Sequence, residues 1–74
     1  MSAFDFVLQG PGLSDTDHTV LRDAARARSV EAGHGASLRL RDSDPSAADA
    51  LRSAVGGKAV DVNLVPAERR LADF

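Results

Sequence analysis

The chain has 74 residues, no cysteine and a formal net charge of −2. This length allows at most one domain, and the lack of cysteine excludes disulfides, zinc ribbons and iron–sulfur ligation. Because non-specific nucleic-acid binders are usually basic, the slight acidic excess also disfavours that class. The longest early apolar stretch, Phe6 to Leu8, is too short for a signal-peptide core or a membrane span, so we expect a cytoplasmic protein with no membrane contact.

Within residues 3–9 the side chains follow a period of two that gives one apolar face, which predicts a first strand. Phe4, Phe6 and Leu8 point one way, and Asp5, Val7 and Gln9 point the other. The Gly-Pro-Gly turn at 10–12 ends it, because proline cannot donate to a strand ladder. Ser14 is expected to cap a first helix that continues to about residue 28, with Asp15 and Asp17 in its first turn.

The second half of the chain repeats the order of strand and helix. Asp44 is suited to an N-cap and Pro45 to the first helical position, within a turn over residues 42–45. The expected elements are a short edge strand over 29–33, a hairpin over 33–35, a strand over 36–41, a helix ended by Gly56 and Gly57, and a last strand over 58–65 that Pro66 stops.

This order predicts an α+β fold: a ferredoxin-like βαββαβ sandwich, with a four-stranded antiparallel sheet and both helices on one face. Asp5 and Arg39 are expected to pair across the two central strands for about a few tenths of a kcal/mol, on an open face that is otherwise solvated. The expected core is Phe4, Phe6, Leu8, Val20, Leu21, Leu38, Leu40, Leu51, Val55, Val60, Val62 and Leu64. The expected open face is Asp5, Val7, Gln9, Glu31, Arg39, Arg41, Asp61 and Asn63.

Catalytic and metal motifs are weak. No hydroxyl lies in a Gly-x-Ser-x-Gly context, and the two histidines, His18 and His34, are separated by a helix and a strand. Asp15, Asp17 and His18 lie within one helical turn, but acidic residues there are usually partners of the helix dipole. The sequence therefore predicts no catalytic residue, no metal site and no cofactor.

The glycine-rich turn after the first strand is the best candidate for a binding site. It lacks the Lys-Ser/Thr pair of a phosphate loop, and Asp15 and Asp17 would repel a polyanion. A small zwitterion such as an amino acid fits better, while a turn that simply needs glycine explains the pattern equally well. The candidate ligand-binding residues are Gln9, Gly10, Pro11, Gly12, Leu13, Ser14 and Asp17.

The order of elements and the turn Gly10-Pro11-Gly12-Leu13 resemble the ACT domain, a small regulatory module. The turn matches the latter part of that family's Gly/Asp-x-Pro-Gly-Leu pattern, although Gly10 stands where an acidic residue is common. The opening segment 4–13 and the closing segment 66–74, with its Arg-Arg-Leu-Ala-Asp-Phe ending, are similar to the N-terminal region of bacterial phosphoserine phosphatases.

The resemblance implies a non-catalytic regulatory or assembly domain over residues 1–66 and a linker over 67–74. The linker would lead to an absent haloacid-dehalogenase catalytic domain, whose chemistry uses Mg²⁺. It also implies an amino-acid ligand such as serine and a possible homodimer. The alternative is a stand-alone ferredoxin-like module that binds RNA or a protein partner through the open sheet face. An acylphosphatase-like hydrolase ranks third, because the loop after the first strand has no arginine and Asn63 is alone.

Overall fold

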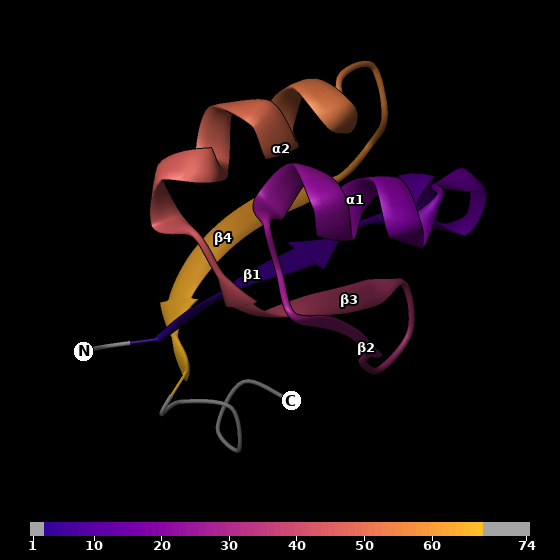
Figure 1. Cartoon of the computed structure of the whole chain (residues 1–74). Helices are drawn as coiled ribbons and strands as arrows, with labels where there is room; N and C mark the ends of the chain where they lie inside the picture. Colours follow the sequence, from indigo (N-terminus) through magenta and orange to yellow (C-terminus); the bar gives the residue numbers. More distant parts are fainter. Residues whose placement is uncertain (1–2, 68–74) are drawn as a thin grey trace.

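The computed structural model describes residues 3–67, apart from the side chain of Asp15, as a four-stranded antiparallel sheet with both helices on one face (Figure 1). The strands lie in the order β2-β3-β1-β4. The elements are β1 (Phe4–Gln9), the 3-10 turn η1 (Pro11–Asp15), α1 (His18–Ala25), β2 (Ser29–Ala32), β3 (Ser37–Ser43), the 3-10 turn η2 (Pro45–Ala47), α2 (Ala48–Ala54) and β4 (Asp61–Pro66).

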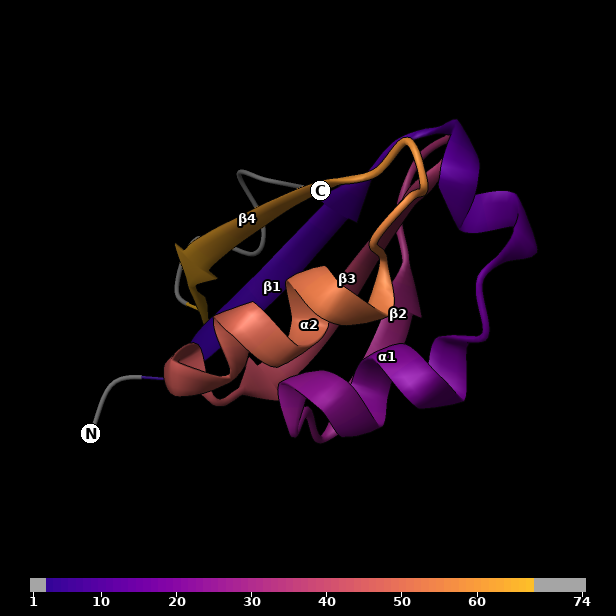
Figure 2. The ribbon, with the colours of Figure 1, turned by 90° about the horizontal axis from the view of Figure 1, so that it is seen from above.

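The two strand–helix–strand units interlock. Each neighbouring pair in the sheet is antiparallel, so β1 runs parallel to β2 with β3 between them, and β3 runs parallel to β4 with β1 between them. This is the split βαβ arrangement, and Figure 2 shows α1 and α2 side by side over the sheet. The predicted ferredoxin-like α+β fold is confirmed. Except for Ala67, the predicted linker and its Arg-Arg-Leu-Ala-Asp-Phe ending lie outside the described residues.

The core lies between the helices and the inner face of the sheet. Phe6 and Leu8 of β1 meet Leu38 and Leu40 of β3 there, as the alternation predicts. Each large apolar side chain buried in this way contributes about 1.5–3 kcal/mol. The buried cluster is completed by Leu13, Leu21, Ala25, Leu51 and Val55, with Val60 and Val62 packed against it.

Two residues that the sequence assigned to the core are exposed, namely Val20 at 51% and Leu64 at 43%. Val20 lies in the first turn of α1, and only the face that carries Leu21 and Ala25 is buried against the core. Leu64 faces the helical side, opposite Phe6, but it lies on the edge strand β4. Leu13 and Ala25 take core positions in their place.

The first helix begins later than predicted. The hydroxyl of Ser14 donates to the carbonyl oxygen of Pro11 at 3.1 Å, within η1, and it does not cap α1. Asp17 is the N-cap, and its carboxylate accepts from the amides of Thr19 and Val20 at 2.9 and 3.4 Å. The extra turn places Leu13 in the core before the helix starts, which explains why the cap moves along the chain.

The third strand runs further than predicted. The register places Leu40 opposite Phe6 but Ser43 opposite Phe4, so Arg41 and Asp42 together stand opposite Asp5. This is a β-bulge, and Asp42 adopts a left-handed backbone with φ of 55°. Residues 42 and 43 therefore belong to β3 rather than to the predicted turn.

The turn before the second helix is capped as predicted. The carboxylate of Asp44 accepts from the amide of Ser46 at 2.9 Å and from its hydroxyl at 2.7 Å, and Pro45 occupies the first helical position of η2. The hydroxyl of Ser46, then its amide, and finally the nearby Arg26 guanidinium hold the pKa of Asp44 below its ordinary value, against a smaller opposing effect of burial.

The depressed pKa of Asp44 makes the stability of this turn pH-dependent. The folded pKa lies below the unfolded one, so the carboxylate stabilises the fold above the unfolded pKa, and this contribution is lost as pH falls through the folded pKa. Asp44→Asn should lower the free energy of unfolding at about pH 7 but not at about pH 2. Urea unfolding at both pH values measures the difference. Asp49→Asn, on α2, controls for the loss of one negative charge, and an equal effect of Asp44→Asn at both pH values would contradict the assignment.

Glycines in the turn after β1 allow a close contact with the segment that leads into β4. Gly10 has φ of 147° and ψ of 160°, a region open almost only to glycine, and a Cβ there would collide with the carbonyl oxygen of Ala59. The amide of Gly12 donates to that same oxygen at 3.2 Å. Residues 58–60 are consequently held against this turn and do not join the strand, so β4 begins at Asp61 rather than at the predicted Lys58.

Substitution of Gly10 tests this contact. Gly10→Ala should destabilise the fold by about 3 kcal/mol or more, because backbone strain and a steric collision both add to the cost. Gly35→Ala is the matched control: Gly35 also has a positive φ, of 61°, but a Cβ there meets nothing within 4 Å. This control should cost only about 1–2 kcal/mol. Equal urea midpoints for the two variants would show that the collision does not matter.

Candidate functional site

The structure does not bring the candidate ligand-binding residues together at one site. Leu13 and Ser14 lie at a surface depression beside α1. Gln9, at the end of β1, lies at a different depression next to β4. Gly10 and Gly12 pack against Ala59, Pro11 is exposed, and Asp17 caps α1. The glycines thus have a structural role that needs no ligand.

The depression beside α1 has a volume of about 430 Å³, within the usual range for small-molecule sites of about 300–1,000 Å³. It is open to solvent between the start of α1 and the hairpin that joins β2 to β3. One wall is formed by Leu13, Ser14 and His18, and the other by Ala36, Ser37 and Leu38 among others. Leu13 and Leu38 are core residues, so the floor of the depression is apolar.

Polar groups lie at the rim of this depression. The hydroxyl of Ser37 donates to the carbonyl oxygen of His34 at 2.9 Å, and that of Ser14 donates to Pro11, so both hydroxyl oxygens keep acceptor capacity. His18 is exposed at the first position of α1. The amides of Thr19 and Val20 are already bonded to Asp17, so the helix start does not offer them to a ligand carboxylate.

The sequence did not single out the hairpin wall of this depression. Ala36, Ser37 and Leu38 follow the Gly33–Gly35 connection, where a tight turn was the natural interpretation. Their position beside η1 depends on the pairing of β3 with β1, in which Ser37 stands opposite Gln9 and Leu38 opposite Leu8. No local sequence signal gives this register.

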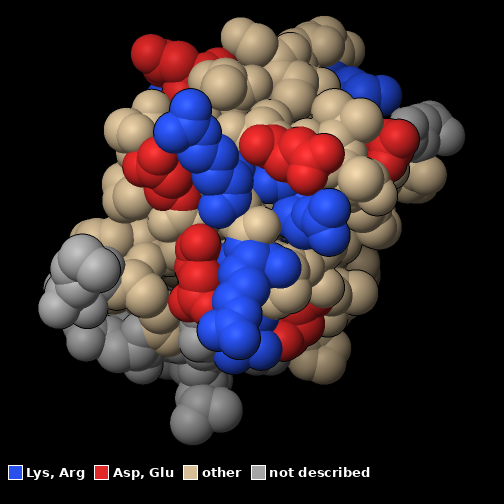
Figure 3. Space-filling model, viewed as in Figure 1, with Lys and Arg blue, Asp and Glu red and all other residues tan. Residues whose placement is uncertain are grey.

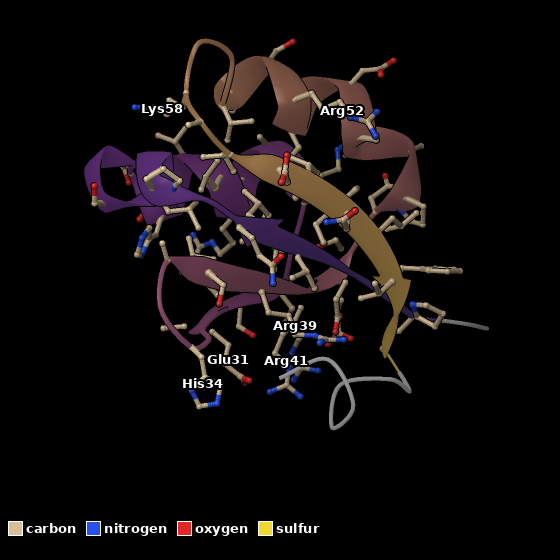
Figure 4. All side chains as sticks on the ribbon, turned by 180° about the vertical axis from the view of Figure 1, so that it is seen from behind. Glu31, His34, Arg39, Arg41, Arg52 and Lys58 are labelled. Atoms are coloured by element: carbon tan, nitrogen blue, oxygen red, sulfur yellow. The ribbon has the colours of Figure 1, made fainter. Side chains whose placement is uncertain are left out.

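The opposite face of the sheet holds a buried ion pair. Nε of Arg39 donates to the Asp5 carboxylate at 2.6 Å, and the amide of Asp42 donates to the other carboxylate oxygen at 2.9 Å. Both side chains of the ion pair are fully buried, and Val7 is only 5% exposed. Figure 4 shows Arg39 and Arg41 pointing away from the helices.

The predicted pairing of Asp5 with Arg39 is confirmed, but the prediction that this face is solvated is wrong for its centre. Asp5, Val7 and Arg39 are buried, whereas Gln9, Glu31, Asp61 and Asn63 are exposed. The buried centre presents neither rings nor accessible charge to a partner, which gives the RNA-binding alternative no support.

The surface charge is mixed. Figure 3 shows basic and acidic side chains interspersed over the face viewed in Figure 1. Arg41 pairs with Glu31 at 2.9 Å, and Arg26 pairs with Asp44 at 3.4 Å. Such exposed pairs are each worth about 0–1 kcal/mol. On the face that Figure 3 shows, the interspersed charges leave no field of a single sign.

Residues 3–67 contain no group of three or more His, Asp or Glu side chains placed to hold a metal ion; the side chain of Asp15 is outside that statement. No helix among the same residues has the length and apolar character needed to cross a membrane. Comparisons of the chain with protein-family models, with curated proteins and with solved structures find no match.

Breaking the buried ion pair should be costly. Arg39→Met leaves the Asp5 carboxylate buried without its cation, and such a loss typically costs about 3–5 kcal/mol. Replacing both partners, in Asp5→Val with Arg39→Met, should restore part of that loss, because no uncompensated charge then remains. Urea unfolding of the single and double variants measures the coupling.

Arg41→Met is the control for this pair, because it removes an arginine from the same strand that is only partly buried and bonded to Glu31. It should cost no more than about 1 kcal/mol. A loss for Arg39→Met as small as that for Arg41→Met would contradict the assignment.

Proposed function

We propose that this chain is a non-catalytic regulatory and assembly module, an ACT-like N-terminal domain of a cytoplasmic bacterial phosphoserine phosphatase. In such a parent, the phosphate chemistry and its Mg²⁺ belong to a following haloacid-dehalogenase domain. The module's own contribution is to bind a small amino acid, with L-serine the first candidate. The resemblance of segments 4–13 and 66–74 to that family motivates the choice of parent.

One observation supports ligand binding above the others. The depression beside α1 is lined by Leu13 and Ser14, which directly follow the glycine-rich turn over residues 10–12, and it combines an apolar floor with a polar rim. An amino acid needs partners for a carboxylate and an ammonium group. A ring N–H of His18 is suited to donate to the carboxylate, and the hydroxyl oxygens of Ser14 and Ser37, which keep acceptor capacity, are suited to accept from the ammonium group.

Titration with L-serine, followed by amide chemical shifts of the ¹⁵N-labelled chain, tests this proposal. The expected result is saturable movement confined to residues 13–18 and 35–38, with a Kd of about 1 mM, a value typical of a weak small-ligand complex. His18→Gln should weaken binding several-fold. His34→Gln is the matched control, because His34 is exposed in the hairpin but does not line the depression.

A titration without movement at about ten times that concentration would remove the amino-acid ligand and leave only the assembly role. The parent is tested separately, by the coding sequence that follows Phe74. A strand with an Asp-x-Asp-x-Thr/Ser motif there supports a phosphatase parent, whereas a stop codon favours the stand-alone module.

A further inference from the structure

The two edges of the sheet differ in how they are protected against pairing with another strand. Natural edge strands are usually short, charged or bulged. β2 fits this description, with four residues that include Glu31, which is paired to Arg41. β4 has six residues, and its only charge is Asp61 at its start. Figure 2 shows β4 along the outer side of the sheet.

The peptide groups that β4 turns outward can be identified from its pairing with β1. The amide of Ala67 donates to the carbonyl oxygen of Ala3 at 2.9 Å, in register with the β1–β4 ladder. Antiparallel bonding alternates along a strand, so Asn63 and Val65 bond toward β1, while Val62 and Leu64 direct N–H and C=O away from it. Pro66 follows in the outward series, where proline is tolerated because no N–H is needed.

The side chains of β4 are also left partly uncovered. Leu64 is 43% exposed on the helical face. On the opposite face, a depression of about 290 Å³ adjoins the strand and is lined by Val7, Gln9, Asn63, Leu64 and Val65. An edge whose only charge lies at its start, with an exposed leucine and an adjoining hollow, is suited to another apolar strand.

We propose that β4 pairs with β4 of a second copy of this chain, antiparallel and about a two-fold axis at Asn63, to form one continuous sheet. In this register, Val62 exchanges both of its outward hydrogen bonds with Leu64 of the second copy, and the reverse exchange follows by symmetry. Asn63 lies opposite Asn63 of the second copy, and Asp61 lies opposite Val65 of the second copy. No like charges oppose each other, and Leu64 gains an apolar neighbour on the helical side.

The neighbouring registers satisfy fewer groups. An axis at Leu64 would place Pro66 opposite Val62, whose carbonyl oxygen would then lack a donor. An axis at Val62 would place Val60 opposite Leu64, but the amide of Val60 already donates to Lys58 at 2.9 Å. Because β4 is self-complementary about Asn63, a second copy of this chain is the partner that fits this edge. This pairing gives the proposed assembly role a defined surface, and it does not depend on ligand binding or on the identity of the parent.

Sedimentation velocity of the full chain across a concentration series, without ligand, tests the dimer. We expect a concentration-dependent monomer–dimer equilibrium, and Leu64→Lys should weaken it by about tenfold or more. Val20→Lys is the matched control, since it places the same charge at a similarly exposed apolar position on α1, which packs over β2 and β3. It should leave association unchanged. Circular dichroism checks that both variants fold.

Disulfide trapping tests the register and does not depend on how Leu64→Lys folds. The chain has no cysteine, so each single-cysteine variant reports on one position. Asn63→Cys should oxidise rapidly to a covalent dimer, because a non-hydrogen-bonded antiparallel pair brings Cα atoms to about 4.5 Å, within disulfide reach. Asp61→Cys, which lies opposite Val65, should not.

Three results would overturn the proposal. One is a monomer at every concentration, with Asn63→Cys no faster to oxidise than Asp61→Cys. Another is a dimer that Leu64→Lys leaves intact, which would place the interface elsewhere. The third is trapping of Asp61→Cys as fast as Asn63→Cys, which would mean a different register.

Discussion

The carboxylate of Asp5 fixes the relation between the two central strands. One oxygen accepts from Arg39 at 2.6 Å, and the other accepts at 2.9 Å from the amide that the bulge at Asp42 turns toward it. Charges buried in this way are tolerated only when they are paired and hydrogen-bonded. Slipping β3 by one residue would move its buried leucines off the core face and break both contacts, so one register satisfies the apolar face and the polar face together.

With β1 and β3 fixed, the other two strands are placed by pairing with the two outer edges of this central pair. β1 also pairs with β4, and the turn over residues 10–12 returns against Ala59 just before β4 begins. β3 carries β2 on its far side, and the hairpin between them forms one wall of the depression beside α1. Binding at that depression and pairing through β4 would consequently use opposite edges of the sheet, so the chain has room for both at once.

Much of the fold is readable from local patterns. Alternation in β1 and β3, the cap at Asp44 and the glycines after α2 all act within a few residues of chain, and they agree with the structure. The first helix was misplaced because Ser14 and Asp17 are both competent caps, and the choice was made by the burial of Leu13. Of the proposed ligand residues, only Leu13 and Ser14 line the depression beside α1, because its other wall comes from a strand distant in sequence.

The sequence by itself determined the order of strands and helices, and with it the split βαβ sandwich, because the periods of strand and helix and the turn residues act locally. Tertiary structure alone decided that Asp5 and Arg39 are buried, that β3 bulges at Asp42, and that Val20 and Leu64 remain exposed. Each of these depends on residues that meet across the sheet or at its edge. Asp5 and Arg39, for example, are 34 positions apart in the chain. Alternation assigns a side chain to a face, but only the assembled layers decide whether that face meets solvent.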